Sequence, residues 1–331
     1  MAVQPTTSAR AAILLAGHLR NVCEDSRLNA TLLDQVSQCR ANFPAGCDIF
    51  MAVWDKLEAD TRLYFETLTE EQAKQYKVRS PNAVNRYRGA DARPCVAELM
   101  NSMRPTALLV HQQPPPAVIN KTNSTEVPGI FRCSASNCVG YKLMWENLWS
   151  VVDLMKRHQT RTGVQYAVAI RLRPDAGDPS ILAKYSKPLP DWSAMRHASS
   201  SATWALRSCG KNRMGDGGSD NCFWSAPPHA LIAAVHQLHT RADDLLALNY
   251  SAKYGVCHPV VKLHGAEGAL LCAMREQHIA NCALADGASC AKGKLQRLSL
   301  GQWETCLPSK YGRCGAPNGA TMPKGWPPRW Q

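Results

Sequence analysis

The sequence lacks three features that mark common classes of protein. None of its 14 cysteines forms a Cys-x-x-Cys pair, which argues against a zinc ribbon or a thioredoxin-type redox centre. No block of about five consecutive lysines and arginines marks a nucleic-acid-binding arm. The longest apolar run near the start, Ala11 to Gly17, is far shorter than the roughly 20 residues that span a membrane. We expect no transmembrane segment, no signal peptide and no nucleic-acid polymer as partner.

The composition is that of a folded domain with a basic surface. Hydrophobic residues make up 45% of the 331 residues and charged residues 19%, which leaves little room for extensive disorder. Lysine and arginine together number 38, against 26 for aspartate and glutamate, giving a net charge of +12. This balance favours an anionic partner, and a nucleotide diphosphate fits it as well as a polymer does.

The cysteine count and the glycosylation sequons point to an oxidising compartment. An even number of cysteines in a secreted chain is typical of a disulfide framework, whose pairing the sequence leaves open. The pairs at short separation are Cys133/Cys138, Cys282/Cys290 and Cys306/Cys314. The sequons begin at Asn29, Asn120, Asn123 and Asn249. We expect the secretory pathway, with the Golgi lumen as its site, which requires a signal or anchor absent from this chain; the alternative is the cytoplasm.

The first part of the chain is predicted to form a strand, a helix and a second strand. A continuous apolar run at 10–15 predicts a buried strand, and helical spacing of apolar residues predicts a helix at 27–43. Another strand is expected at 48–54. A strand–helix–strand unit of this length makes a parallel pair, and a parallel sheet binds ligands at the carboxyl ends of its strands.

Further elements follow with the same alternation. We expect an exposed helical region at 58–85, strands at 107–111 and 166–170, and helices at 141–158, 227–248 and 267–279. The domains expected are an N-terminal extension at 1–9, a catalytic domain at 10–282 with a long loop at 112–140, and a tail rich in Cys, Pro and Gly at 283–331. Trp145 and Trp149 lie on the helix at 141–158, where their spacing favours core packing over sugar stacking.

The segment that ends the strand at 166–170 is the most informative. Pro174 ends the extended run sharply, so Asp175 projects from the carboxyl end of the strand. There its carboxylate could hold Mg²⁺ or Mn²⁺ beside a diphosphate, or it could simply cap the following turn. Of Arg171 and Arg173, we expect at most one to share a site with Asp175.

Six segments in a fixed order resemble a known family. They are Ile13-Leu-Leu-Ala-Gly-His-Leu-Arg20, Asp48-Ile-Phe-Met-Ala-Val-Trp-Asp55, Tyr141-Lys-Leu-Met-Trp145, Tyr166-Ala-Val-Ala-Ile-Arg-Leu-Arg-Pro-Asp175, Gly215-Asp-Gly-Gly-Ser-Asp220 and Glu267-Gly-Ala-Leu-Leu271. Together they resemble glycosyltransferase-like proteins of algae, large viruses and bacterial surface-polysaccharide clusters. The resemblance implies an α/β fold of GT-A type, with a mostly parallel central sheet and helices on both faces.

The resemblance also implies a function and its residues. The chain would transfer a sugar from a nucleotide-sugar donor to a glycan or glycoprotein acceptor, with possible help from Mn²⁺ or Mg²⁺. The donor-binding residues implied are Gly17, Arg20, Asp55, Arg171 and Arg173; the metal ligands are Asp175 and His258; the candidate bases are Asp220 and Glu267. Metal-dependent members commonly present two acidic residues where only Asp175 stands here, and the last segment has Ala266 in place of proline.

Each of these residues also has a structural explanation. Arg20 could be a solvated surface arginine, and Asp55 a cap for the residues that follow it. Asp220 could be an ordinary loop residue, and Glu267 could stabilise the first turn of a helix. The competing function is that of a secreted, disulfide-rich protein that binds carbohydrate or has a structural role, without catalysis.

Overall fold

The computed structural model of the chain describes residues 9–20, 22–57, 89–112, 135–176, 189–198, 205–209, 222–242, 270, 273 and 280–282. Several predictions lie outside these residues. They are the first eight residues of the N-terminal extension, the helical region at 58–85, most of the loop at 112–140, the tail, and the candidate site residues Asp220, His258 and Glu267.

The described strands form one seven-stranded sheet in the order β3-β2-β1-β4-β6-β5-β7. The strands are β1 (Ala11–Gly17), β2 (Cys47–Trp54), β3 (Ala107–His111), β4 (Val168–Leu172), β5 (Ala205–Ser208), β6 (Cys222–Ser225) and β7 (Ala280–Cys282). The four strands predicted from the sequence are confirmed, with small shifts at their ends. β1 continues to Gly17 because its backbone pairs with β2 as far as Val53.

The sheet is parallel on one side and mixed on the other. β3, β2, β1 and β4 pair in parallel, whereas β6 runs antiparallel to both β4 and β5, and β7 is parallel to β5. The prediction of an α/β fold is therefore confirmed, and β6 is the one described strand that runs against the others. The antiparallel strand was not expected because local apolar patterns carry no information on strand direction.

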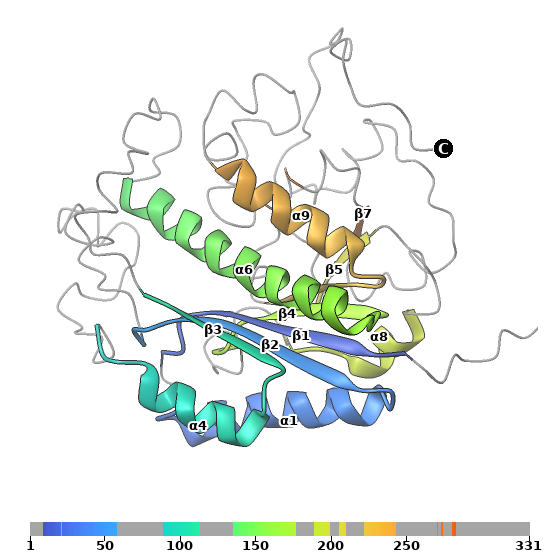
Figure 1. Cartoon of the computed structure of the whole chain (residues 1–331), viewed down its shortest axis with the longest axis horizontal. Helices are drawn as coiled ribbons and strands as arrows, with labels where there is room; N and C mark the ends of the chain where they lie inside the picture. Colours follow the sequence, from blue (N-terminus) through green and yellow to red (C-terminus); the bar gives the residue numbers. More distant parts are fainter. Residues whose placement is uncertain are drawn as a thin grey trace, which may run out of the picture.

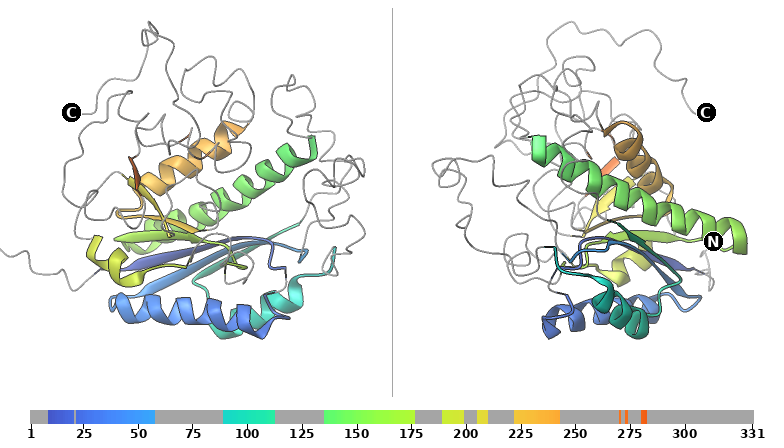
Figure 2. Two further views of the ribbon diagram at one scale, coloured as in Figure 1. Left: turned by 180° about the vertical axis from the view of Figure 1, so that it is seen from behind. Right: turned by 60° about the vertical axis from the view of Figure 1, so that its left-hand side comes forward.

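Helices cover both faces of this sheet, as predicted (Figures 1 and 2). α1 (Ser26–Asn42) and α4 (Arg93–Met103) lie on one face, together with the short α8 (Trp192–Ala198). α6 (Ala135–Thr162) and α9 (His229–Thr240) lie on the other face. α1 begins where expected, because the Asp25 side chain caps it by accepting a hydrogen bond from the Arg27 backbone N–H at 3.0 Å.

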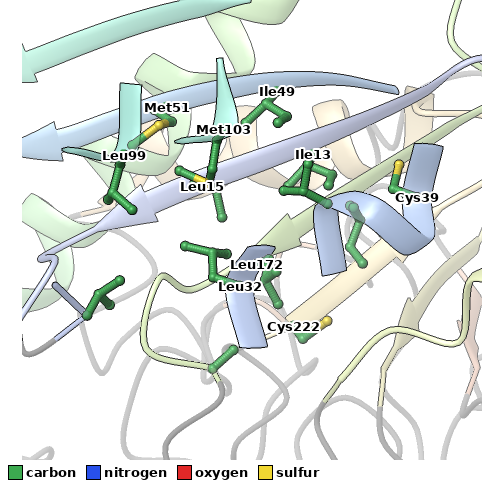
Figure 3. Packing of buried hydrophobic residues seen from close by; sticks show 14 of the residues in the cluster. Ile13, Leu15, Leu32, Cys39, Ile49, Met51, Leu99, Met103, Leu172 and Cys222 are labelled. Carbon is green, nitrogen blue, oxygen red and sulfur yellow. The ribbon is translucent and has the colours of Figure 1, made fainter. Parts of the chain in front are cut away.

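The core is two layers separated by the sheet, because side chains alternate along each strand. In β1 the odd residues Ile13 and Leu15 face α1, and the even residues Leu14 and Ala16 face α6. Figure 3 shows the first layer. Its labelled residues are Ile13, Leu15, Leu32, Cys39, Ile49, Met51, Leu99, Met103, Leu172 and Cys222. Trp145 is fully buried in the second layer, as its helical spacing predicts, and Trp149 packs against that layer.

The chain adds strands first on one side of β1 and then on the other. From β1 it moves outward to β2 and then β3, with α1 and α4 on one face. It then crosses back by α6 on the opposite face and adds β4 on the other side of β1. The strand order therefore reverses between β1 and β4. In open α/β sheets such a switch point forms the ligand-binding crevice.

Three disulfides join described cysteines, which confirms the prediction of disulfide bonding. They are Cys23–Cys95, Cys39–Cys47 and Cys209–Cys222. Each pair suggested by short separation includes a cysteine outside the described residues. Disulfides are typical of oxidising compartments. Asn29, the one described sequon asparagine, donates from its side-chain amide to Glu98 at 2.7 Å. Among the described helices, none is long and apolar enough to cross a bilayer.

Candidate functional site

The loop after β1 is held in place by the segment that follows β2. Gly17 has a φ of 129°, a conformation that favours glycine, and the next residue on this loop with positive φ is Arg20, at 49°. The backbone N–H of Arg20 donates to the carbonyl of Leu57 at 2.7 Å, and His18 Nδ1 donates to the carbonyl of Lys56 at 3.2 Å. Two hydrogen bonds to adjacent residues fix the direction in which Arg20 leaves the sheet.

The loop after β4 brings Asp175 to the same point. The N–H of Ala176 donates to the carbonyl of Arg173 at 3.1 Å and closes a turn around Pro174. Asp175 accepts from Arg20 Nη1 at 2.6 Å, from Arg173 Nε at 2.8 Å and from Arg173 Nη2 at 2.7 Å. Residues 155 positions apart thus meet at the switch point between β1 and β4.

Burial and charge give this trio its character. The Asp175 side chain is 3% exposed, whereas those of Arg173 and Arg20 are 21% and 38% exposed. Burial alone would raise the pKa of Asp175, but the attraction and hydrogen bonds of Arg173 and Arg20 outweigh it and lower the pKa to about 2. The carboxylate is therefore charged at neutral pH, and the three side chains carry a net charge of +1. The two guanidinium groups are the partly exposed members of the trio, and the carboxylate is the buried one.

The residues present do not fit a metal ion at Asp175. Both of its carboxylate oxygens already accept short hydrogen bonds from guanidinium groups, whose charge repels a cation. Mg²⁺ or Mn²⁺ would take one or two carboxylates together with phosphate oxygens. In the described part of the chain, no group of three His, Cys, Asp or Glu side chains is arranged to hold a metal. The other predicted ligand, His258, lies outside the described residues.

The remaining predicted donor-binding residues lie in different surroundings. Arg171 is buried, with its guanidinium 5.9 Å from the centre of the Phe223 ring in the layer beneath α6 and α9. Of the two arginines of β4 and its loop, Arg173 is the one bonded to Asp175. The backbone of Asp55 joins three elements: its N–H donates to His111 at 2.8 Å, and its carbonyl accepts from Ala92 at 2.9 Å.

The sequence reasoning missed a row of rings beside this trio. The Trp54 ring lies 6.1 Å from His18 and 5.3 Å from His111, centre to centre. These residues end or directly follow β2, β1 and β3, so the row runs along the carboxyl ends of three parallel strands. The signal was present in the sequence, since each ring stands at the end of a predicted strand. It was missed because the strands' order in the sheet was not known.

Comparisons of the chain with protein-family models, with curated proteins and with solved structures find no match. The functional conclusion therefore depends on the chemistry and position of the described site.

Proposed function

We propose that this chain is a glycosyltransferase with a GT-A-like α/β fold, and that Arg20 and Arg173 bind the diphosphate of its nucleotide-sugar donor. The observation that carries the proposal is the pair of guanidinium groups oriented by one buried carboxylate at the switch point of the sheet. The acceptor is a glycan or glycoprotein, and the Golgi lumen is the compartment that agrees with the disulfides and the sequons.

The position supports this proposal because open α/β sheets bind nucleotides where neighbouring crossovers go to opposite faces. Here that point lies between β1 and β4, and both arginines leave the sheet there. Arg20 also adopts a left-handed backbone conformation, with a φ of 49°, which costs a residue other than glycine about 1 kcal/mol. Strained backbone of this kind clusters at ligand-binding sites.

The residue type supports a phosphate ligand. A guanidinium group is planar, stays charged at all working pH values, and matches phosphate oxygens with paired N–H donors. Asp175 accepts one N–H from Arg20 and two from Arg173, and so holds both planes in fixed directions. Preorganised donors bind anions better than mobile ones, because little ordering remains to be done on binding.

In the reaction, these arginines would act on the leaving group. The acceptor hydroxyl oxygen forms a bond to the anomeric carbon while the bond from that carbon to the donor phosphate oxygen breaks, and its electron pair stays on the diphosphate. Arg20 and Arg173 would stabilise the charge that develops there. A base accepts the hydroxyl proton; Asp220 and Glu267 remain the candidates. No step is assigned to a metal ion, because the surroundings of Asp175 do not fit one.

The competing function is a secreted protein that binds carbohydrate without catalysis. It explains the disulfides equally well. It gives no reason for two arginines and a buried carboxylate to meet at a switch point.

Thermal unfolding of the full chain against nucleotides tests the proposal. The panel is UDP, GDP, CDP and ADP with their common nucleotide sugars, each with and without Mn²⁺, and donor hydrolysis is measured in parallel. A ligand at 100 times its dissociation constant should add about 2.7 kcal/mol of stability. Arg173→Ala should reduce this protection by about half or more. Arg157→Ala, which removes an exposed arginine of α6, should keep it. If nothing in the panel protects the wild type, the carbohydrate-binding function replaces this one.

A further inference from the structure

We propose that the ring of His18, supported by Trp54, forms the subsite for the nucleobase of the donor. This inference rests on the proposed function, because it places the nucleobase relative to the diphosphate at Arg20 and Arg173. It fixes the direction of the donor along the edge of the sheet, with the base toward β2 and β3 and the sugar toward β6.

The support beneath His18 is rigid. Trp54 is buried, and its indole Nε1 donates to the side-chain oxygen of Asn147 on α6 at 3.1 Å; the amide nitrogen of Asn147 donates in turn to the carbonyl of Ala52. His111 packs against the same indole from β3. A tryptophan fixed by a hydrogen bond and by packing on two sides cannot turn to meet a ligand, but it can hold the ring above it in place.

His18 is the member of the row that lies on the same loop as Arg20, whereas His111, also partly exposed, lies on β3 on the other side of Trp54. The His18 ring is partly exposed, and its plane lies 30° from that of Trp54. The hydrogen bond to the carbonyl of Lys56 requires the proton on Nδ1, because a carbonyl can only accept. This bond sets both the tautomer and the tilt of the ring. His18 stands two residues before Arg20 on one short loop, so a ligand held by Arg20 lies close to it.

The opposite side of the switch point offers no comparable ring among the described residues. The rings of Phe223 and Trp224 on β6 are fully buried, and the end of β6 beside β4 is occupied by the Cys209–Cys222 disulfide. Bases stack on aromatic and imidazole rings through their π faces. The partly exposed ring on the β1 side therefore determines which way the donor lies.

The test compares nucleoside diphosphates with inorganic pyrophosphate, which has the same charged group and no base. Calorimetry measures the dissociation constants of UDP, GDP, CDP, ADP and pyrophosphate for the wild type, His18→Ala and His18→Phe. His229→Ala is the matched control, since His229 is exposed at the start of α9 and follows β6 at the amino ends of the parallel strands. Thermal midpoints show whether each variant is folded.

We expect at least one nucleoside diphosphate to bind the wild type more tightly than pyrophosphate. His18→Ala should weaken that binding by about 10-fold or more and change pyrophosphate binding by less than about 2-fold. His18→Phe keeps a ring and should lose less than about 3-fold, and His229→Ala should change nothing. If His18→Ala leaves all constants unchanged, or weakens pyrophosphate as much as the nucleotides, the inference is wrong and the diphosphate site stands. If the wild type binds none of the five, the proposed function fails as well.

Discussion

The two ends of the parallel strands each carry one carboxylate, Asp48 partly buried and Asp175 buried, with different partners. At the amino ends, Asp48 accepts from Arg10 at 2.9 Å, from the Tyr166 hydroxyl at 2.8 Å and from the Thr106 hydroxyl at 3.1 Å. At the carboxyl ends, Asp175 accepts only from arginines among its described partners. Asp48 is paired with one arginine, whereas Asp175 is paired with two.

From this difference we infer that the Asp48 group is structural and that the Asp175 group is the one that binds a ligand. The members of the Asp48 group stand at or near the starts of the four parallel strands: Arg10 at β1, Asp48 at β2, Thr106 at β3 and Tyr166 at β4. One carboxylate therefore joins the amino ends of all four. Such a network is complete without a ligand. The Asp175 group joins two loops, and we propose that its two arginines bind an anion.

The largest effect should come from the disulfides at the two ends. Cys23–Cys95, at the carboxyl ends, closes a separation of 72 residues, and Cys39–Cys47, at the amino ends, closes one of 8. The loss of chain entropy predicts about 4 kcal/mol for the first and about 2.5 kcal/mol for the second. Urea unfolding of the two double Cys→Ser variants measures both. An equal loss would show that native-state contacts, and not loop length, set the values.

Removing either carboxylate should reduce stability, but only the removal of Asp175 should also weaken nucleotide binding. The pKa of Asp175 is lowered to about 2, so its contribution of about 2 kcal/mol is full above pH 4 and is lost as the pH falls toward 2. The pKa of Asp48 is also lowered: burial raises it, but the bonds from Tyr166 and Arg10 outweigh burial. Asp175→Asn and Asp48→Asn should therefore both reduce stability at pH 7 and flatten its fall in acid.

Of these two variants, only Asp175→Asn should also weaken nucleotide binding, because Asp175, unlike Asp48, orients Arg20 and Arg173. Thermal unfolding between pH 2 and 7, with and without the best nucleoside diphosphate, measures both properties. Asp34→Asn, at an exposed position of α1, serves as the control and should change stability by less than about 0.5 kcal/mol. Equal nucleotide binding by the wild type and Asp175→Asn would remove the distinction between the two ends.

The smallest effects should come from two glycines with similar backbone angles. Gly17 at the carboxyl end has a φ of 129°, and a Cβ there would have no atom within 4 Å. Gly46 before β2 has a φ of 132°, and a Cβ there would lie 2.7 Å from the Arg10 guanidinium carbon. Gly17→Ala should cost about 1 kcal/mol from backbone strain alone, and Gly46→Ala about 2 kcal/mol because Arg10 must also move away from Asp48. Chemical denaturation compares them; a larger loss for Gly17→Ala would contradict this reading.

Much of the parallel half of the fold could be predicted from the sequence. The elements whose apolar runs were long or continuous enough to be recognised are β1, β2, β3, β4, α1 and α6. β5 and the antiparallel β6 were missed because they have four residues each, too few for a period to show. α4 was missed because Arg93 and Pro94 begin it without a side-chain cap.

Single residues of the site were predicted, but their arrangement was not. Arg20 and Asp175 were each selected as strand-end residues, but their pairing depends on β4 lying beside β1, which no local pattern contains. For the same reason Asp175 was assigned to a metal, whereas the structure pairs it with two cations. Strand alternation alone would put Arg171 and Arg173 on one face. They separate because β4 ends at Leu172 and a turn around Pro174 follows, so Arg173 lies in the loop.

Calorimetric titration with the best nucleoside diphosphate tests the central claim most directly, using wild type, Arg20→Ala, Arg173→Ala and Arg10→Ala. Removing a charge-assisted pair from a phosphate costs about 1.5–3 kcal/mol, so Arg20→Ala and Arg173→Ala should each weaken binding by roughly 10- to 100-fold. Arg10→Ala should lower the melting temperature and leave the affinity unchanged. If Arg10→Ala weakens binding as much as Arg173→Ala does, the ligand does not lie at the carboxyl ends of β1 and β4, and the account is wrong.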